Sequence, residues 1–201
     1  MTDKEIIVQL EDELGRKLRQ LDKVLWFSKG YVMNDGKVTA LSLQSFNLKG
    51  IVPQSLFNLK HLEYLDIRQN DLNELPDKFV SLIQLAYLDV RYNNLKHLPS
   101  SVKSLKHVNK IYLGNNSFET IPLEITEMYC LEIADLSENS ITSIDESFSN
   151  RARIKHLYLN YNQIRKIDFN TIINSNIDFV ILKDNPIQIT QDVPKYEKII
   201  I

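Results

Sequence analysis

Hydrophobic and polar positions recur along most of the chain at a spacing of 23 residues. The segment Leu62–Gln84 is followed directly by Leu85–His107, and both carry apolar residues, one asparagine and one proline at the same places. A 24-residue unit precedes these two, and regular units continue after them to a final partial one. The units begin at Val38, Leu62, Leu85, Val108, Leu131, Ile154 and Ile177. A period of this length predicts a solenoid of seven stacked units.

The alternation within each unit predicts a short strand, such as Tyr64–Arg68. Leu65 and Ile67 are expected to point into the core, and the residues beside them to point outward. Successive strands are expected to pair in parallel and form one curved sheet. An asparagine follows each strand in six units, where its amide could bond both its own turn and the neighbouring turn. These asparagines are Asn70, Asn93, Asn116, Asn139, Asn162 and Asn185.

The pattern LxxLxLxxNxLxxLP, present in the units that begin at Leu62 and Leu85, resembles that of leucine-rich repeat proteins of the intracellular LxxLP type. The resemblance implies an α/β fold, a horseshoe-shaped solenoid with a concave parallel β-sheet. Residues 38–187 are interpreted as the repeats. The resemblance also implies a protein or peptide partner and no enzymatic activity. That branch includes scaffolds for small GTPases and their regulators, so a small GTPase becomes a candidate partner.

Residues 1–37 are interpreted as an N-terminal cap made of a helix and a hairpin. Apolar residues at three- or four-residue intervals predict a helix over residues 2–27, with a capping box from Thr2 and Glu5 and an end at Trp26 and Phe27. Residues 31–41 predict a hairpin, because their central Asp-Gly pair tolerates positive φ angles. Since such a cap covers the exposed end of a solenoid, no partner-binding role is assigned to it.

The convex side changes character along the chain. Units two to four have a Leu-Pro or Ile-Pro pair, which starts a short extended or single-turn segment, whereas units five and six have Ile144-Asp145 and Ile167-Asp168. One interpretation is a second contact surface near Phe148–Arg153. The favoured alternative is a wider, more helical convex turn.

Residues 188–201 follow the last unit and are interpreted as a C-terminal cap or tail. The chain closes with Ile199–Ile201, an unusual composition for a solvated terminus. These isoleucines either pack over the last unit, which is the favoured interpretation, or form an edge that pairs with a second copy to give a homodimer.

Composition and charge limit the classes of partner that the chain is expected to bind and the cellular compartment in which it is expected to lie. The chain has 24 Lys and Arg against 26 Asp and Glu, so it lacks the positive field on which nucleic-acid binding relies. Its single cysteine, Cys130, forms no intramolecular disulfide, which favours a reducing compartment. The N-terminal residues lack the pattern of a signal peptide, and no segment has the ~18 apolar residues of a membrane helix. We expect a cytoplasmic protein without membrane insertion.

The sequence contains few residues that could form a catalytic, metal-binding or phosphate-binding site. The sequence contains no glycine-rich phosphate-binding motif, and its four histidines show no metal-ligand spacing. Cys130 is expected to be half-buried and unreactive. Asp66, Asp89 and Asp135 fall in one column of the predicted sheet, which indicates a solvated face and offers no pocket for acid–base catalysis. No catalytic residue, metal site or cofactor is therefore predicted.

The outward positions of the concave face are rich in tyrosine and arginine, the residue types that often dominate binding energy at protein interfaces. Tyr64 is expected to stack on Tyr87, and Arg68 and Arg91 are expected to lie beside the aspartates diagonal to them. The alternative is that these ladders only stabilise the sheet. The predicted partner-binding residues are Tyr64, Asp66, Arg68, Tyr87, Asp89, Arg91, Tyr92, Tyr112, Asp135, His156, Tyr158 and Tyr161.

Two functional hypotheses follow. The first is a protein-interaction module that holds a protein or peptide on the concave face from Tyr64 to Tyr161, as a scaffold or regulator in small-GTPase signalling. The second is a structural or self-associating solenoid that uses its C-terminal end.

Overall fold

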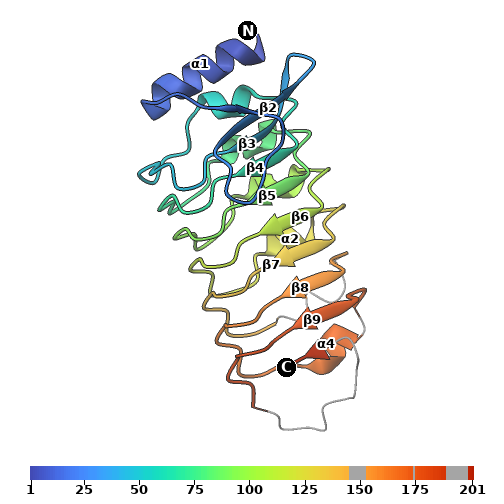
Figure 1. Cartoon of the computed structure of the whole chain (residues 1–201). Coiled ribbons are helices and arrows are strands. Elements are labelled where there is room, and N and C mark those ends of the chain that lie inside the picture. The colour runs from blue at the N-terminus through green and yellow to red at the C-terminus, as the bar shows by residue number, and fades with distance from the viewer. Residues whose placement is uncertain (145–152, 174, 189–198) are drawn as a thin grey trace.

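A computed structural model describes residues 1–144, 153–173, 175–188 and 199–201. Ten strands form one sheet in the order of the chain, from β1 to β10. Figure 1 shows them stacked one after another, with helix α1 (Asp3–Leu14) across the N-terminal end and the C-terminus beside the last strands. This is the predicted solenoid.

The repeat strands pair in parallel at one constant register. Tyr64 lies opposite Tyr87, Leu65 opposite Leu88 and Asp66 opposite Asp89, because a fixed 23-residue offset brings equivalent positions side by side. The same register continues through the later units. The repeat strands are β3 (Lys37–Ser42), β4 (Tyr64–Asp66), β5 (Tyr87–Asp89), β6 (Lys110–Tyr112), β7 (Ile133–Asp135), β8 (His156–Tyr158) and β9 (Phe179–Ile181).

Short helices line the convex side. Pro76, Pro99 and Pro122 each occupy the residue before one of them, as predicted for the second to fourth units. The sixth unit is helical at this place, in line with the favoured interpretation, whereas residues 145–152 of the fifth unit lie outside the described residues. The convex helices are η1 (Ser55–Asn58), η2 (Asp77–Ser81), η3 (Ser100–Ser104), α2 (Leu123–Thr126) and α4 (Phe169–Ile173).

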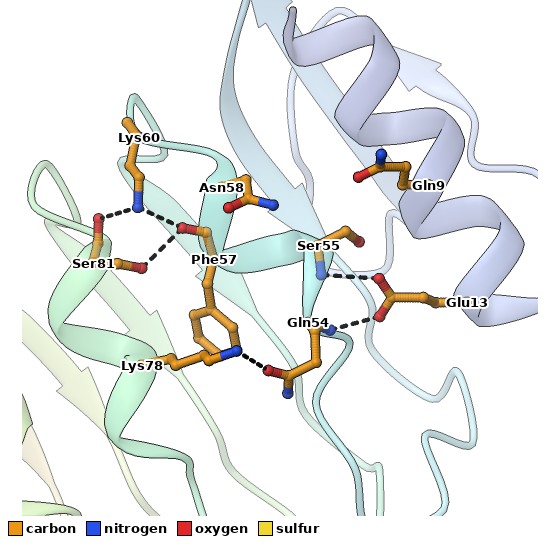
Figure 2. A pocket seen from close by; sticks show the side chains of 9 residues that line it. All are labelled: Gln9, Glu13, Gln54, Ser55, Phe57, Asn58, Lys60, Lys78 and Ser81. Atoms are coloured by element: carbon orange, nitrogen blue, oxygen red, sulfur yellow. Dashed lines mark hydrogen bonds between the residues drawn. The ribbon is translucent and has the colours of Figure 1, made fainter. Parts of the chain in front are cut away.

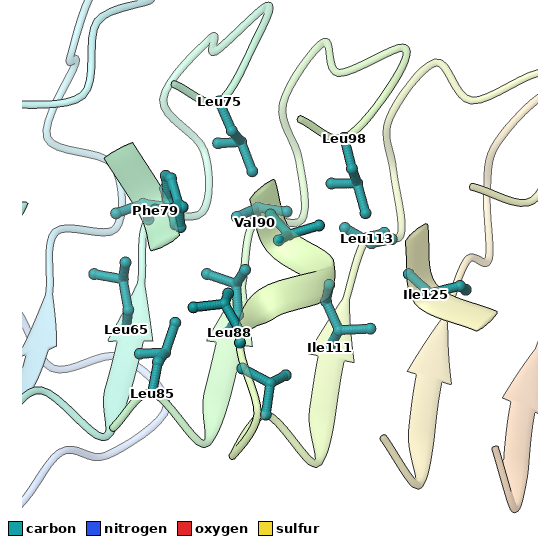
Figure 3. Packing of buried hydrophobic residues seen from close by; sticks show 14 of the residues in the cluster. Leu65, Leu75, Phe79, Leu85, Leu88, Val90, Leu98, Ile111, Leu113 and Ile125 are labelled. Carbon is teal, nitrogen blue, oxygen red and sulfur yellow. The ribbon is translucent and has the colours of Figure 1, made fainter. Parts of the chain in front are cut away.

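The hydrophobic core runs between the sheet and the convex helices (Figure 3). Leu65 and Leu88 point into it from the strands, and Phe79 packs into it from η2, all three without exposed surface. The ring of Phe79 meets that of Phe57 edge-on at 5.3 Å between centroids. Because each unit shares its core residues with the next, a single unit has no closed core of its own.

The recurring asparagines join neighbouring turns, as predicted. Asn93 Oδ1 accepts the backbone N–H groups of Asn70 (3.1 Å) and Leu72 (3.0 Å) in the preceding turn. Its Nδ2 donates to the carbonyl oxygens of Val90 in its own turn (2.9 Å) and Ile67 in the preceding one (3.2 Å). The other five make equivalent contacts.

Helix α1 is shorter than the predicted helix. Its capping box from Thr2 and Glu5 is present, but it ends at Leu14, where Gly15 adopts the left-handed conformation (φ 65°) and closes the last turn. The prediction of a helix over residues 2–27 is therefore wrong in its second half.

Two strands follow instead. β1 (Gln20–Leu21) pairs in parallel with β2 (Gly30–Asn34), and β2 forms the predicted antiparallel hairpin with β3. The turn of this hairpin has positive φ at Asp35 (48°) and Gly36 (74°).

Residues 22–29 connect β1 to β2, and we call them the Trp26 loop. In Figure 1 the loop is dark blue and extends from the N-terminal cap over the neighbouring repeat strands. Its two ends meet where β1 and β2 pair, and the amide of Tyr31 donates to the Arg19 carbonyl (3.0 Å). The loop therefore lies on the concave face although it belongs to the cap.

The C-terminal residues extend the sheet. β10 (Ile199–Ile200) pairs in parallel with β9, and the partly buried Ile199 packs against the core. This arrangement fits the interpretation of the C-terminal residues as a cap. Among the described residues, no helix is long and apolar enough to cross a membrane.

Candidate protein-binding face

The concave face carries a row of stacked aromatic rings across three neighbouring strands. Tyr64 and Tyr87 stack with their centroids 4.4 Å apart and their planes at 15°, as predicted. Tyr112 continues the row at 5.1 Å from Tyr87 with a tilt of 36°. The constant register brings these side chains together, because Tyr64 and Tyr87 occupy the same outward position of adjacent strands.

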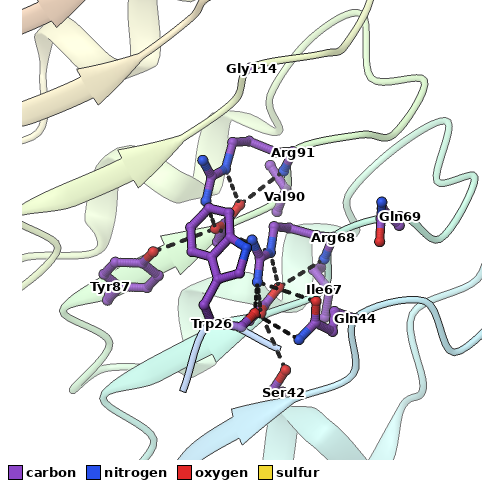
Figure 4. A network of polar contacts seen from close by, with 12 residues as sticks. Trp26, Ser42, Gln44, Ile67, Arg68, Gln69, Tyr87, Val90, Arg91 and Gly114 are labelled. Atoms are coloured by element: carbon purple, nitrogen blue, oxygen red, sulfur yellow. Dashed lines mark hydrogen bonds and ion pairs between the residues drawn. The ribbon is translucent and has the colours of Figure 1, made fainter. Parts of the chain in front are cut away.

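A network of ion pairs lies beside the tyrosines (Figure 4). Arg68 donates to both carboxylate oxygens of Asp66 (3.0 and 2.9 Å), and its Nε lies 3.4 Å from Asp89. Arg91 donates to Asp89 of its own unit (3.0 and 2.5 Å). The predicted diagonal pairing is therefore present between Arg68 and Asp89, whereas Arg91 pairs within its own unit, and each guanidinium group has a fixed position.

The expectation that the aspartate column is solvated is wrong for Asp66 and Asp89. Neither has exposed surface, and Arg68 is only 4% exposed, whereas Asp135 is partly exposed and accepts from Ser137. Arginine side chains and the loop above them exclude water from the two aspartates. Asp66 and Asp89 thus hold the arginines in place, and a partner cannot reach them in this arrangement.

Trp26 covers the two arginines. Its ring lies 4.1 Å from the guanidinium carbon of Arg68 and 4.7 Å from that of Arg91, distances at which a cation and an aromatic face attract each other. Its carbonyl oxygen accepts from Arg68 Nη2 (2.7 Å) and Gln44 Nε2 (3.0 Å). Arg91 also stacks on Tyr112 at 4.8 Å, so its guanidinium lies between two aromatic rings.

Sequence reasoning missed this contact. It treated Trp26 and Phe27 as the end of a helix and gave residues 1–37 no place on the concave face. The available signal was the run Leu25-Trp26-Phe27 just before Ser28 and Gly30, which follows a helix-ending Gly15 and belongs to no repeat position.

The predicted residues of the later units form a second aromatic group. His156 and Tyr158 both contact Phe179, at 4.4 and 5.5 Å between centroids. Phe179 was not among the predicted site residues, although it occupies the outward position equivalent to Tyr64 and Tyr87. The two groups lie on the same sheet face, on β4–β6 and on β8–β9 respectively.

Tyr92 and Tyr161 are the most accessible of the predicted tyrosines, with 46% and 53% of their surface exposed. Both have left-handed backbone angles (φ 56° and 57°) at the turn that follows a strand. Equivalent positions in the other units also have positive φ, at Ser45, Gln69, Asn115, Glu138 and Asp184. Because a bulky residue is strained there, each tyrosine is presented to solvent at a cost in backbone energy.

Burial raises the pKa of the stacked tyrosines. It raises the pKa of Tyr64 to about 12, and it raises that of Tyr87 further, with added repulsion from the Asp89 carboxylate. Burial also raises the pKa of Asp89, although the Arg91 guanidinium favours the ionised carboxylate. The pKa of Arg91 is raised by its hydrogen bond to Asp89 despite its desolvation. The phenols are therefore neutral and the guanidinium groups charged at neutral pH.

Reactive groups outside this face are scattered. Within the described residues, no cluster of His, Cys, Asp and Glu could hold a metal ion. Cys130 is exposed, not half-buried as expected, because it lies in the turn before the buried Leu131. An open recess of about 500 Å³ between α1 and the first convex helices is lined by polar residues and Phe57 (Figure 2). Its Glu13 and Lys78 are engaged by the backbone of Ser55 (2.9 Å) and the side chain of Gln54 (2.7 Å).

Comparison with known proteins bears on the repeats. Residues 37–166 match the family model described as a leucine-rich repeat region. No curated protein sequence matches the chain significantly. The chain is similar to a solved leucine-rich repeat protein of Leptospira interrogans, with 28% identity and a TM-score of 0.63 over 70% of this chain and 36% of that one.

Two solved plant receptors are also similar. The peptide hormone receptor RGFR1, in complex with RGF2, shares 27% identity with a TM-score of 0.57 over 68% of this chain and 23% of the receptor. The ectodomain of the Arabidopsis thaliana receptor kinase GASSHO1/SCHENGEN3, in complex with CASPARIAN STRIP INTEGRITY FACTOR 2, has a TM-score of 0.68 at 20% identity, over 90% of this chain and 24% of that one.

The chain spans about a third or less of the length of these three structures. The match to the family model nevertheless covers more than half of this chain, and the sheet, the asparagine contacts and the convex helices repeat at the same period. The chain belongs to the leucine-rich repeat family.

Proposed function

We propose that the chain is a protein-interaction module whose concave face, from Tyr64 to Tyr161, holds a protein or peptide partner. The observation that carries this proposal is the pair of aromatic groups on one sheet face, with exposed Tyr92 and Tyr161 beside them. Rigid aromatic side chains supply a large contact area at low entropic cost. Shape supports the same proposal, since the concave row of strands offers an extended open surface in place of an enclosed cavity.

The similar plant receptors support a protein or peptide ligand, because they were solved with RGF2 and with CASPARIAN STRIP INTEGRITY FACTOR 2. A small GTPase as the partner, a scaffold or regulatory role in its signalling, and a cytoplasmic location are proposed from the LxxLP pattern and the single cysteine. The aromatic face suits a peptide ligand as well as the surface of a folded GTPase.

The test compares two variants of the full chain in affinity capture from native lysate. The first carries Tyr92→Ala, Tyr112→Ala and Tyr161→Ala on the concave face. The second carries Tyr129→Ala, which removes an equally large side chain that is 65% exposed in the turn before β7. Each interface tyrosine contributes on the order of 1–2 kcal/mol, so the triple variant should lose at least about 100-fold in affinity. Equal capture by both folded variants would contradict the proposal.

A second candidate function is self-association through the C-terminal end. β10 is the last strand of the sheet, and its Ile200 and the following residue Ile201 are 47% and 44% exposed. An apolar edge strand can pair with a second copy. Molar mass measured by light scattering over a range of concentrations tests this, with a chain lacking residues 199–201 as the control. A monomer at every concentration rules the candidate out.

A further inference from the structure

We propose that the Trp26 loop is a built-in occupant of the concave face, and that the paired guanidinium groups beneath it are the docking place for an aromatic side chain of the protein partner. We call the groups of Arg68 and Arg91 the arginine shelf. The inference rests on the proposed function, since it specifies how a protein would engage part of the concave face.

The loop is fastened by backbone pairing at its ends, whereas at its tip the carbonyl oxygens of Trp26 and Ser28 accept hydrogen bonds from side chains of the sheet. At the ends, β1 pairs with β2, and a side chain on Gly30 would lie 2.1 Å from the Arg19 carbonyl oxygen, so the two segments pack closely. At the tip, Leu25, Trp26 and Phe27 are 44%, 63% and 77% exposed. The tip therefore buries little apolar surface, and lifting it opens no part of the hydrophobic core.

The arginine shelf is supported from below, independently of the loop. Arg68 is held by Asp66 and Asp89, and Arg91 is held by Asp89 and stacks on Tyr112. These contacts all come from strands β4, β5 and β6. When Trp26 leaves, the two guanidinium groups keep their carboxylate partners and their orientation, and their upper faces become free.

The present occupant shows which chemistry the shelf accepts. An aromatic ring lies over both guanidinium groups, and the carbonyl oxygen of the same residue accepts hydrogen bonds from Arg68 and Gln44. Asp66 and Asp89 balance the charge of the two arginines, which favours an aromatic ring over a carboxylate as the occupant. The partner is thus a protein segment that presents tryptophan, tyrosine or phenylalanine together with its own backbone carbonyl.

The loop and the partner would compete for one place. A partner that supplies the aromatic residue must displace Trp26, and the apparent affinity is then reduced by the fraction of chains whose loop is closed. Removing the Trp26 side chain should therefore increase the affinity of the partner for the arginine shelf. If Trp26 instead contacted the partner directly, its removal would lower that affinity.

The experiment uses the loop sequence itself as the probe. Trp26 is the sole tryptophan of the chain, so in the full-length Trp26→Ala variant a synthetic peptide of residues 22–29, DKVLWFSK, carries the only indole. Peptide fluorescence is titrated with this variant, with the wild-type chain and with a Trp26→Phe variant, which keeps an aromatic occupant. We expect saturable binding to Trp26→Ala and at least about tenfold weaker binding to the other two by the competition above. An excess of a peptide with alanine for tryptophan should not displace the bound peptide.

Two further variants locate the binding in the Trp26→Ala background. Arg91→Gln should weaken peptide binding at least about tenfold, since it removes one cation from beneath the ring. Tyr129→Ala, in the turn before β7 and outside the proposed binding face, should leave it unchanged. Circular dichroism and thermal melts establish that each variant is folded.

Three results would overturn the inference: no saturable binding to the folded Trp26→Ala chain, equal binding to the wild-type chain, or equal loss with Tyr129→Ala. The peptide assay needs no natural partner, so its failure leaves the tyrosine capture experiment untouched. Conversely, the peptide could bind the shelf while both tyrosine variants capture the same protein equally. The shelf would then be a binding site that the captured protein does not use.

Discussion

Replacement of Asn93 by alanine tests how the stacked turns hold together. The side chain lies in the interior and accepts hydrogen bonds from the backbone amides of Asn70 and Leu72. It also donates to the carbonyl oxygens of Ile67 and Val90. Alanine fits the space but satisfies none of these groups.

The two amides carry the expected loss of stability. The carbonyl of Ile67 retains a hydrogen bond from Asn70 Nδ2, and that of Val90 retains one from Asn116 Nδ2. The backbone amides of Asn70 and Leu72 donate to Asn93 Oδ1, and among the described residues no second acceptor remains for them once this oxygen is removed. Each buried unsatisfied donor costs about 1–3 kcal/mol, so the two amides together predict a loss of about 2–6 kcal/mol. With a urea slope of about 2 kcal/mol/M, the midpoint falls by roughly 2 M.

The assay is urea unfolding followed by circular dichroism, with Asn94→Ala as the matched control. Asn94 is the next residue and its side chain is exposed, so its replacement should change stability by less than about 0.5 kcal/mol. A folded Asn93→Ala chain that loses less than about 1 kcal/mol, with an unchanged slope, would refute the reasoning. It would mean that water or a shift of the turn satisfies both amides.

Other predictions concern the core, the loop and the tyrosine row. Phe79→Ala should destabilise the chain by about 3–5 kcal/mol in urea unfolding, whereas Val80→Ala, at a side chain 46% exposed, should cost less than about 1 kcal/mol. Gly30→Ala should lower the melting temperature more than Gly15→Ala, because a Cβ at Gly30 meets backbone at 2.1 Å while one at Gly15 meets nothing within 4 Å. Equal melting temperatures would contradict this. The pKa of Tyr64, raised from 10.0 to about 12, gives a stabilisation that is fully present below pH 10 and lost as pH rises through about 12. The stability difference between wild type and Tyr64→Phe should therefore shrink from about pH 9 to about pH 11.5 in urea unfolding, and a constant difference would exclude the burial effect.

Features that follow from the repeat period could be predicted from the sequence. A constant 23-residue offset determines which side chains meet, so the register, the asparagine contacts and the stacking of Tyr64 on Tyr87 followed from positions alone. The same logic placed Arg68 beside Asp89 of the next unit. These are contacts between neighbouring units, and a one-dimensional pattern describes them fully.

Features that depend on contacts outside the repeat could not be predicted this way. Leu18, Leu21 and Leu25 continue the helical spacing past Gly15, and the period alone does not show that the chain leaves the helix there. The burial of Asp66 and Asp89 depends on a loop more than 35 residues earlier in the sequence. A pattern of exposed and buried positions within the repeats carries no information about that loop.

The position of the Trp26 loop has a consequence for how the chain unfolds. In a repeat array each unit touches only its neighbours, and stability is nearly a sum of local terms. Here Trp26 contacts Gln44, Arg68 and Arg91, which belong to three successive units. While the loop is closed, the cap and the first three units are thereby coupled into one cooperative block. Among the described residues, the units after the third make no such contact with Trp26. Native-state hydrogen exchange should therefore show these later units opening from the C-terminal end, while the N-terminal block exchanges as a whole.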